Sequence, residues 1–242
     1  MSQIHSESIE YKDGETVLEG YISYDESFAG IRPAVLVVHE WTGLNDYSKM
    51  RADMLAKLGY FAFAVDIYGK GIRPDNPQDA GKQASIYKSD RKLMRSRITA
   101  ALDELKKQKL ADVNNIAAIG YCFGGTVALE LARSGAEIKG VVSFHGGLDN
   151  VKMAGATDIK ARILVCHGAA DPYVPEEQVK AFEEEMNNAG ANYKIIYYEG
   201  AVHSFTNPKS GNDPSRGAAY NEAADKKSWE DMKDFFKEIF GK

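Results

Sequence analysis

The most constraining feature of this sequence is a repeated alternation between short apolar runs and longer segments whose apolar residues recur at helical spacing. Such an alternation predicts an α/β fold, with a mostly parallel sheet between layers of helices. Near-continuous apolar character in the short runs indicates strands that are buried on both faces. We therefore predict buried strands at residues 34–38, 61–65, 115–119, 138–142 and 162–166, and a last strand at 193–198.

The first 27 or so residues follow a different pattern, because polar and apolar side chains alternate around a turn signal at Lys12-Asp13-Gly14. This pattern predicts an antiparallel hairpin at an edge of the sheet. The loop at 206–217 is rich in Gly, Pro and Ser but too short for a domain linker, so one domain is expected over residues 1–242. Helices are predicted over residues 48–58, 78–109 with a break, 124–134, 175–188 and 218–240.

The composition excludes several classes of protein. A chain of 242 residues with 44% hydrophobic and 27% charged residues has the balance of a globular domain. Its net charge of -5 and its dispersed basic residues, clustered only at 106–109, argue against a nucleic-acid partner. No apolar run approaches the roughly 18 residues of a membrane span, and the polar start is unlike a signal peptide. We therefore expect a cytoplasmic protein whose two cysteines are thiols.

A candidate nucleophile lies where the predicted strand 115–119 leads into Gly120-Tyr121-Cys122-Phe123-Gly124-Gly125 and then into a predicted helix. Strand, sharp turn and helix form a nucleophile elbow, in which small residues allow the turn to lift one side chain above the sheet. The helix N-terminus also favours a thiolate at Cys122. The alternative is a structural cysteine in a tight turn. Cys166, inside an apolar strand, is expected to be such a buried residue.

Two loops that follow predicted strands supply an acid and a base. Asp171 follows the strand at 162–166, and His203 follows the strand at 193–198. Nucleophile, acid and histidine in this chain order are typical of one hydrolase architecture. The imidazole can take the thiol proton and later activate water, while the carboxylate orients the imidazole. The competing histidines are His5 in the hairpin, His39 in another loop, and His145 and His167 at strand ends.

The loop after strand 34–38, His39-Glu40-Trp41-Thr42-Gly43-Leu44-Asn45, is placed to complete an oxyanion hole. Acyl transfer needs two backbone N–H groups, one from the residue after the nucleophile and one from this loop. Those residues are Phe123 and Trp41. The support for Trp41 is positional, and its ring could instead pack as a wall.

The elbow, the loop 39–45, Asp171 and His203-Ser204-Phe205 together resemble the dienelactone hydrolase (carboxymethylenebutenolidase-like) family. The resemblance spans nearly the whole chain. It implies a single-domain α/β-hydrolase fold without a large cap, which hydrolyses ester or lactone bonds and needs no cofactor or metal. In that family an acidic residue at the position of Glu40 interacts with the cysteine and helps to generate the thiolate.

The chain departs from this family at the substrate pocket. Members that hydrolyse dienelactone hold its carboxylate with arginines, one of them four residues after the catalytic histidine, where this chain has Asn207. A second arginine is expected after Asp66-Ile67-Tyr68, where Arg73 and Arg91 are candidates. The substrate is therefore expected to differ from dienelactone.

These patterns predict a cysteine hydrolase that cleaves a small ester or lactone through a thioester intermediate, as a monomer or small homo-oligomer. A general carboxylesterase or a peptidase on the same fold is an alternative, because a fold does not fix its substrate. A non-catalytic binding or redox-sensing protein with a reactive thiol at Cys122 is another.

Overall fold

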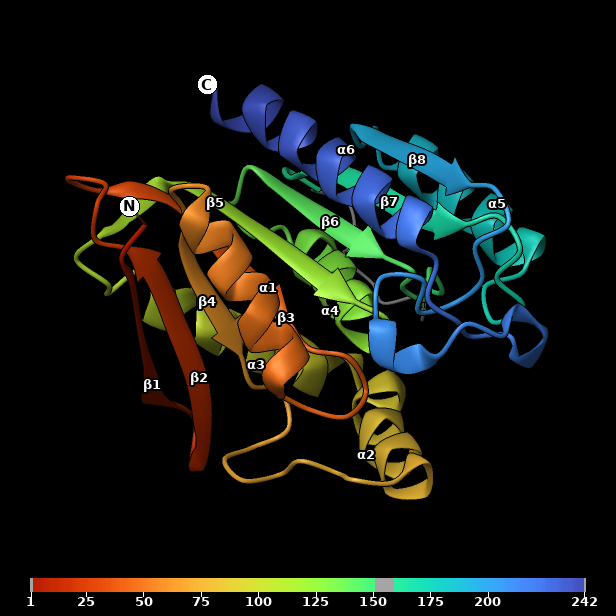
Figure 1. Ribbon diagram of the computed structural model, residues 1–242, viewed down its shortest axis with the longest axis horizontal. Helices are drawn as coiled ribbons and strands as arrows, with labels where there is room; N and C mark the ends of the chain where they lie inside the picture. The colour runs from red at the N-terminus through yellow and green to blue at the C-terminus, as the bar shows by residue number, and fades with distance from the viewer. Residues whose placement is uncertain (1, 151–158, 242) are drawn as a thin grey trace. The chain divides into compact units, whose positions relative to one another are not determined.

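The computed structural model describes residues 2–150 and 159–241. They form two compact units that meet in the chain between Ile119 and Gly120. The single domain expected over the whole chain stays a prediction. The first unit holds the helices α1 (Asp46–Lys57), α2 (Pro77–Ser89) and α3 (Arg91–Leu105) and the strands β1 (Ile4–Asp13), β2 (Thr16–Asp25), β3 (Arg32–Val38), β4 (Phe61–Val65) and most of β5 (Ala111–Tyr121) (Figure 1).

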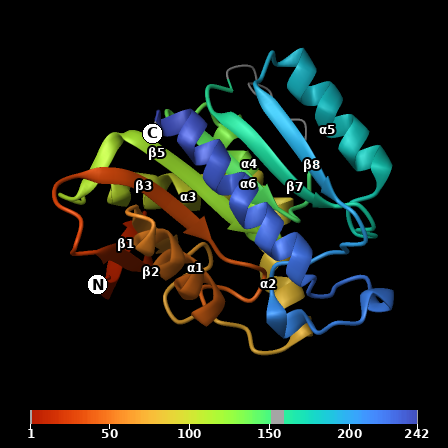
Figure 2. The ribbon, with the colours of Figure 1, turned by 45° about the horizontal axis from the view of Figure 1, so that its top comes forward.

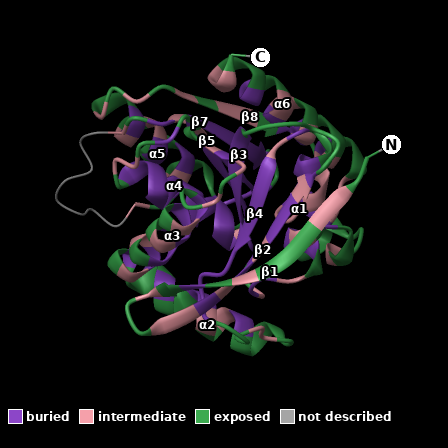
Figure 3. Cartoon of the chain, turned by 90° about the vertical axis from the view of Figure 1, so that its left-hand side faces the viewer, coloured by how far each residue is buried: buried purple, intermediate pink, exposed green. Residues whose placement is uncertain are grey.

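The strands of the first unit lie in the order β1-β2-β4-β3-β5. β1 and β2 pair antiparallel along their full length, which confirms the predicted edge hairpin. β2 is antiparallel to β4, and β3 is parallel to β4. Every residue of β3 and β4 is buried, as Figure 3 shows, because α1 and α3 cover opposite faces of these strands.

Helix caps explain the break predicted within residues 78–109. Asn76 accepts a hydrogen bond from the Asp79 N–H, and Pro77 occupies the first turn of α2. α2 ends at Ser89. Asp90 then caps α3 by accepting a hydrogen bond from the Leu93 N–H. One residue therefore ends the first helix and starts the second.

The second unit begins with the end of β5, beside which β6, β7 and β8 follow in sheet order. β6 is parallel to β7 and β7 is parallel to β8. In this unit α4 and α6 lie on opposite faces of the strands (Figure 2). Its elements are β6 (Gly140–Phe144), β7 (Arg162–Gly168), β8 (Tyr193–Tyr198), α4 (Phe123–Arg133), α5 (Glu176–Asn188) and α6 (Glu222–Phe240), with short 3-10 turns η1 (Pro208–Ser210) and η2 (Pro214–Arg216) in the loop predicted at 206–217.

The strand predicted at 138–142 was placed two residues too early. β6 continues through the polar Ser143 to Phe144, which pairs with Cys166 of β7. Ser143 is fully buried, and its hydroxyl fills a space beside Gly125, where a Cβ would come within 2.5 Å of it. The C-terminal end of β6 is therefore determined by the close packing of Ser143 against Gly125, and not by apolar side chains.

The sheet is mostly parallel with an antiparallel N-terminal edge, which confirms the predicted fold class. In the part of the chain that the structure describes, no helix is long and apolar enough to cross a membrane.

Candidate active site

Cys122 lies in the sharp turn between β5 and α4, at the N-cap position of α4. Its backbone has φ 53° and ψ -117°, which is strained for a residue with a side chain. A Cβ at Gly120 would collide with the carbonyl oxygen of Gly124, so the turn closes only with glycine there. The predicted elbow therefore has the geometry that lifts one side chain off the sheet, and Cys122 is half-buried.

The structure brings Cys122, His203 and Asp171 into one hydrogen-bonded chain. His203 Nε2 lies 3.0 Å from Cys122 Sγ, and His203 Nδ1 donates to Asp171 Oδ2 at 2.8 Å. The other carboxylate oxygen of Asp171 accepts from the Tyr173 N–H at 2.8 Å. Both oxygens of Asp171 are thus engaged, which fixes the orientation of the imidazole.

The loop that carries His203 is held by the chain that precedes α6. The His203 N–H donates to the Gly217 carbonyl at 3.2 Å, and the Ala219 N–H donates to the His203 carbonyl at 3.0 Å. Ser204, the next residue, has a positive φ of 55°. A strained backbone next to the imidazole persists because these contacts on both sides determine it.

The charged groups around His203 favour a protonated imidazole. Burial would lower the pKa of His203, but the charge of Cys122 and the hydrogen bond to Asp171 outweigh it and raise the pKa to about 10. An imidazolium at neutral pH is the form that pairs with a thiolate. The raised pKa therefore keeps the His203 imidazole positively charged at neutral pH, with its Nε2 3.0 Å from the Cys122 sulfur.

His145 lies directly beside the hydrogen-bonded series of Cys122, His203 and Asp171, a position that the sequence did not indicate. The Cys122 N–H is shared between the Phe144 carbonyl at 3.0 Å and His145 Nδ1 at 3.1 Å. Because Nδ1 accepts this hydrogen bond, the ring proton is on Nε2, which donates to Thr206 Oγ1 at 2.7 Å. His145, with φ 41°, thus ties the elbow to the loop that follows His203.

Two other histidines are buried, and burial lowers their pKa. For His39 the pKa falls to about 4, so its imidazole is neutral at physiological pH. The pKa of His167 is also lowered. His5 instead lies in the edge hairpin with its side chain 38% exposed, beside Glu7 and Glu26. By contrast, the His203 ring nitrogen Nε2 lies within hydrogen-bond distance of the Cys122 sulfur.

Cys166 behaves as the sequence predicts for a structural residue. It is fully buried in β7, and this burial raises its pKa to about 12. The hydroxyl of Tyr198 lies 3.5 Å from its sulfur. Cys122 and Cys166 are both free thiols.

Glu40 and Trp41 lie in the first unit, in the loop between β3 and α1. Glu40 is buried and Trp41 is 38% exposed. The loop turns sharply at Gly43, where φ is 80° and a Cβ would come within 2.9 Å of the Ile72 carbonyl oxygen. Tyr68 supports the same loop, because its hydroxyl donates to the Trp41 carbonyl at 2.9 Å.

The three candidate substrate-binding residues all have partners within the protein. Arg73 Nη1 lies 3.4 Å from Asp66 Oδ1 and donates to the Gly69 and Ile72 carbonyls. Arg91 is buried, with Nη1 3.6 Å from the Met94 sulfur. Asn207, also buried, accepts from the Lys209 N–H at 3.0 Å and so caps η1. Arg73 thus stabilises its own loop.

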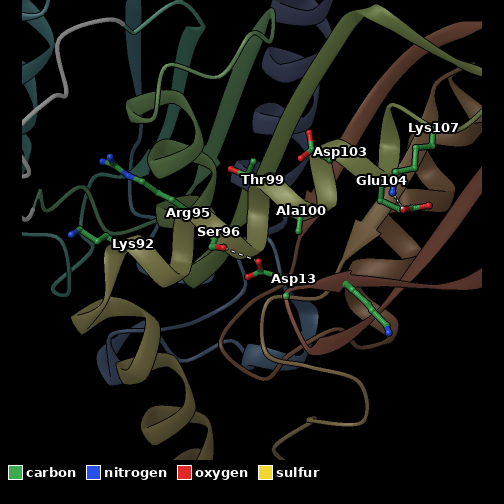
Figure 4. A pocket seen from close by; sticks show the side chains of 11 residues that line it. Asp13, Lys92, Arg95, Ser96, Thr99, Ala100, Asp103, Glu104 and Lys107 are labelled. Atoms are coloured by element: carbon green, nitrogen blue, oxygen red, sulfur yellow. Dashed lines mark hydrogen bonds and ion pairs between the residues drawn. The ribbon is translucent and has the colours of Figure 1, made fainter.

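A surface hollow of the first unit contains none of the predicted site residues. It lies between the β1–β2 turn and α3, and its charges are mixed (Figure 4). Its Asp13 already accepts hydrogen bonds from Ser96 and Arg97. Among the described residues, no group of three or more His, Cys, Asp and Glu side chains could hold a metal ion.

Strand, nucleophile elbow, acid and histidine in this order on a mostly parallel sheet define an α/β-hydrolase. Comparison with known families narrows this class. The model of the dienelactone hydrolase family matches residues 18–240, and the chain belongs to this family. It is accordingly a hydrolase that acts on ester or lactone bonds.

Three relatives illustrate the similarity. A solved structure described as a dienelactone hydrolase-like promiscuous phosphotriesterase from metagenomic libraries is 40% identical, with a TM-score of 0.93 over 98% of this chain and 99% of the other. The "Putative carboxymethylenebutenolidase" of Aquifex aeolicus is 30% identical over 95% of this chain and 96% of that protein. The "Probable 2-oxo-3-(5-oxofuran-2-ylidene)propanoate lactonase" of Bradyrhizobium sp is 30% identical over 73% of this chain and 74% of that protein.

Proposed function

We propose that this protein hydrolyses small, neutral esters or lactones with a Cys122–His203–Asp171 triad. The observation that carries the proposal is the continuous hydrogen-bonded chain from Cys122 Sγ through His203 to Asp171 Oδ2, with steps of 3.0 and 2.8 Å. Cys122 is the nucleophile, His203 the base and Asp171 the residue that orients the base.

The reaction has two stages. The Cys122 thiolate attacks the carbonyl carbon, and backbone N–H groups of Phe123 and Trp41 stabilise the negative oxygen that forms. The carbon–oxygen bond of the ester breaks, the departing alcohol oxygen takes the proton of His203, and a thioester remains on Cys122. His203 then accepts a proton from water, whose oxygen attacks the thioester. The acid leaves and the thiolate returns.

A substrate screen tests this proposal. Purified protein is assayed against activated esters and against five- and six-membered lactones, with Cys122→Ala as the control, and mass spectrometry looks for an acyl group on Cys122. We expect turnover that the Cys122→Ala variant lacks. A thiol that is oxidised while no substrate turns over would instead identify a redox-sensing protein. Preference for peptides over esters would identify a peptidase.

Neutral phosphotriesters are a second candidate substrate class. The metagenomic structure that is 40% identical to this chain is described as a promiscuous phosphotriesterase. A thiolate can attack phosphorus as well as a carbonyl carbon, and the same N–H groups would stabilise charge on the phosphoryl oxygen. A phosphotriester therefore belongs in the screen. Phosphotriester hydrolysis that persists in the Cys122→Ala variant would show that this activity does not depend on the triad.

Glu40→Gln tests whether the buried carboxylate helps to form the thiolate. The substitution keeps the size of the side chain and removes its charge. We expect slower alkylation of Cys122 by iodoacetamide, slower acylation and little change in Tm. Unchanged alkylation and esterase rates would assign Glu40 a purely structural role.

Asn207→Arg tests the preference for neutral substrates. A bound carboxylate needs a charge-assisted partner, which arginine supplies in two-pronged form and asparagine does not. Replacing a neutral hydrogen bond to the carboxylate by a charged one is worth roughly 1 kcal/mol, or several-fold in substrate binding. We expect a higher kcat/KM for carboxylate-bearing lactones, almost no change for neutral esters, and a lower Tm because the cap on Lys209 is lost.

Strong activity of the wild-type protein on dienelactone, unchanged by Asn207→Arg, would contradict this view. It would mean that another residue, such as Arg73 or Arg91, holds the carboxylate. Matched neutral and acidic lactones of the same ring size make the comparison independent of general effects on folding.

A further inference from the structure

His39 is the first residue of the loop that carries Glu40 and Trp41, and both of its ring nitrogens have hydrogen-bond partners. The Ile67 N–H donates to His39 Nε2 at 3.2 Å. Nε2 therefore carries no proton, and the neutral ring holds its proton on Nδ1. That proton is donated to the Glu40 carbonyl oxygen at 2.5 Å. The ring is fully buried, so water does not compete for these bonds.

The Glu40 carbonyl belongs to the same peptide group as the Trp41 N–H. A peptide group is planar and trans, so its carbonyl and its N–H point in opposite directions. A hydrogen bond that fixes the direction of the carbonyl therefore also fixes the direction of the N–H. The Gly43 N–H donates to the same carbonyl at 3.3 Å, which adds a second restraint.

The next peptide group is fixed as well, because the Tyr68 hydroxyl donates to the Trp41 carbonyl. The Tyr68 ring also packs edge-on against the His39 ring, with centroids 4.8 Å apart. The Trp41 N–H thus lies between two restrained carbonyl groups. A hydrogen bond to a carbonyl also polarises its amide and makes the N–H of that amide a better donor.

We propose that His39 is a positioning residue, which orients and polarises the Glu40–Trp41 peptide so that the Trp41 N–H is preorganised as an oxyanion donor. This inference rests on the proposed function, in which the Trp41 N–H stabilises the oxyanion. Such donors act in the transition state only if their direction is set in advance. A misplacement of about 1 Å can cost on the order of a hundredfold in rate.

Two substitutions at His39 separate this role from simple packing. In His39→Asn the side-chain amide lies near the place of Nδ1 and can still donate to the Glu40 carbonyl. In His39→Gln the amide reaches the place of Nε2, so the bond to Ile67 can survive while the bond to Glu40 is lost. Glutamine is closer to histidine in volume. A packing role therefore favours the Gln variant, and a positioning role favours the Asn variant.

The measurements are kcat and KM with p-nitrophenyl acetate, together with the rate of Cys122 alkylation by iodoacetamide. Alkylation attacks a saturated carbon and forms no oxyanion, so it reports on the thiolate alone. We expect His39→Gln to lower kcat at least about tenfold while alkylation stays within about twofold of wild type. His39→Asn should retain most of the wild-type kcat.

Several results would overturn the inference. A Gln variant with wild-type kcat, or more active than the Asn variant, would do so, as would a parallel fall in kcat and alkylation. Nitrogen-15 NMR of histidine-labelled wild-type protein gives a test that needs no variant, because a proton on Nε2 of His39 would exclude donation from Nδ1. Absence of esterase, lactonase and phosphotriesterase turnover in the wild-type protein would instead refute the proposed function, and the inference with it.

Discussion

Brief treatment of the native protein with iodoacetamide at pH 7 is expected to alkylate Cys122 at least roughly a thousandfold faster than Cys166. The thiolate is the reactive form of cysteine. Burial raises the pKa of Cys166 to about 12, so its thiolate is almost absent at neutral pH, and its sulfur is fully buried. Cys122 is half-buried beside an imidazole whose pKa is raised to about 10. Peptide mapping by mass spectrometry measures both rates.

The Cys122→Ala variant is the matched control, because it leaves Cys166 as the single thiol of the chain. It should stay unlabelled in the native state and react fully in denaturant. Earlier labelling of Cys166, or a disulfide between the two cysteines, would contradict the arrangement in which Cys166 pairs with β6 inside the sheet.

The pH dependence of the same reaction tests whether Cys122 and His203 form an ion pair. An unpaired thiol with a pKa of about 8.5 loses nearly tenfold in alkylation rate per pH unit below that value. Because the pKa of His203 is raised, its imidazole stays positively charged from acidic pH up to about 10 and favours the thiolate throughout that range. We expect Cys122 to be alkylated at pH 6 faster than a free cysteine. A profile equal to that of free cysteine would contradict the ion pair.

Turnover should fall by on the order of a hundredfold or more in His203→Ala, the usual loss for a general base. The imidazole has two tasks, since it protonates the departing alcohol and activates water. The variant also loses the cation beside Cys122, so alkylation at neutral pH should slow as well. Steady-state kcat and the alkylation rate are measured on the same preparation.

His5→Ala provides the control for this experiment, because His5 lies in the edge hairpin with its side chain 38% exposed. It should keep wild-type kcat. Near-normal turnover in a folded His203→Ala variant would mean that another group serves as the base. Circular dichroism and Tm establish that the variants are folded.

Local patterns were enough to predict most of the fold. The strand Phe61–Val65 and the strand Tyr193–Tyr198 have the predicted bounds, since turns and polar residues flank their apolar or alternating side chains. The hairpin of β1 and β2 follows from a local turn signal. The end of β6 was missed, because its buried serine is accommodated by glycine packing between distant segments.

The sequence by itself also determined which residues are candidates for the chemistry. The elbow around Cys122 is a local strand, turn and helix, and the loops of Asp171 and His203 follow strands in a recognisable order. These signals depend on residues close together in the chain, where hydrophobic periodicity and turn residues act directly.

Only the tertiary structure decided how these residues meet. Contacts between Cys122, Asp171 and His203 join residues 32 to 81 positions apart, and no local pattern encodes a distance of 3 Å across such separations. The same holds for two of the three buried histidines that the sequence named only as competitors for the catalytic base. His145 binds the elbow backbone and His39 binds the loop of Trp41. Their roles follow from burial and from the donor or acceptor that faces each ring nitrogen, which exist only in the folded chain.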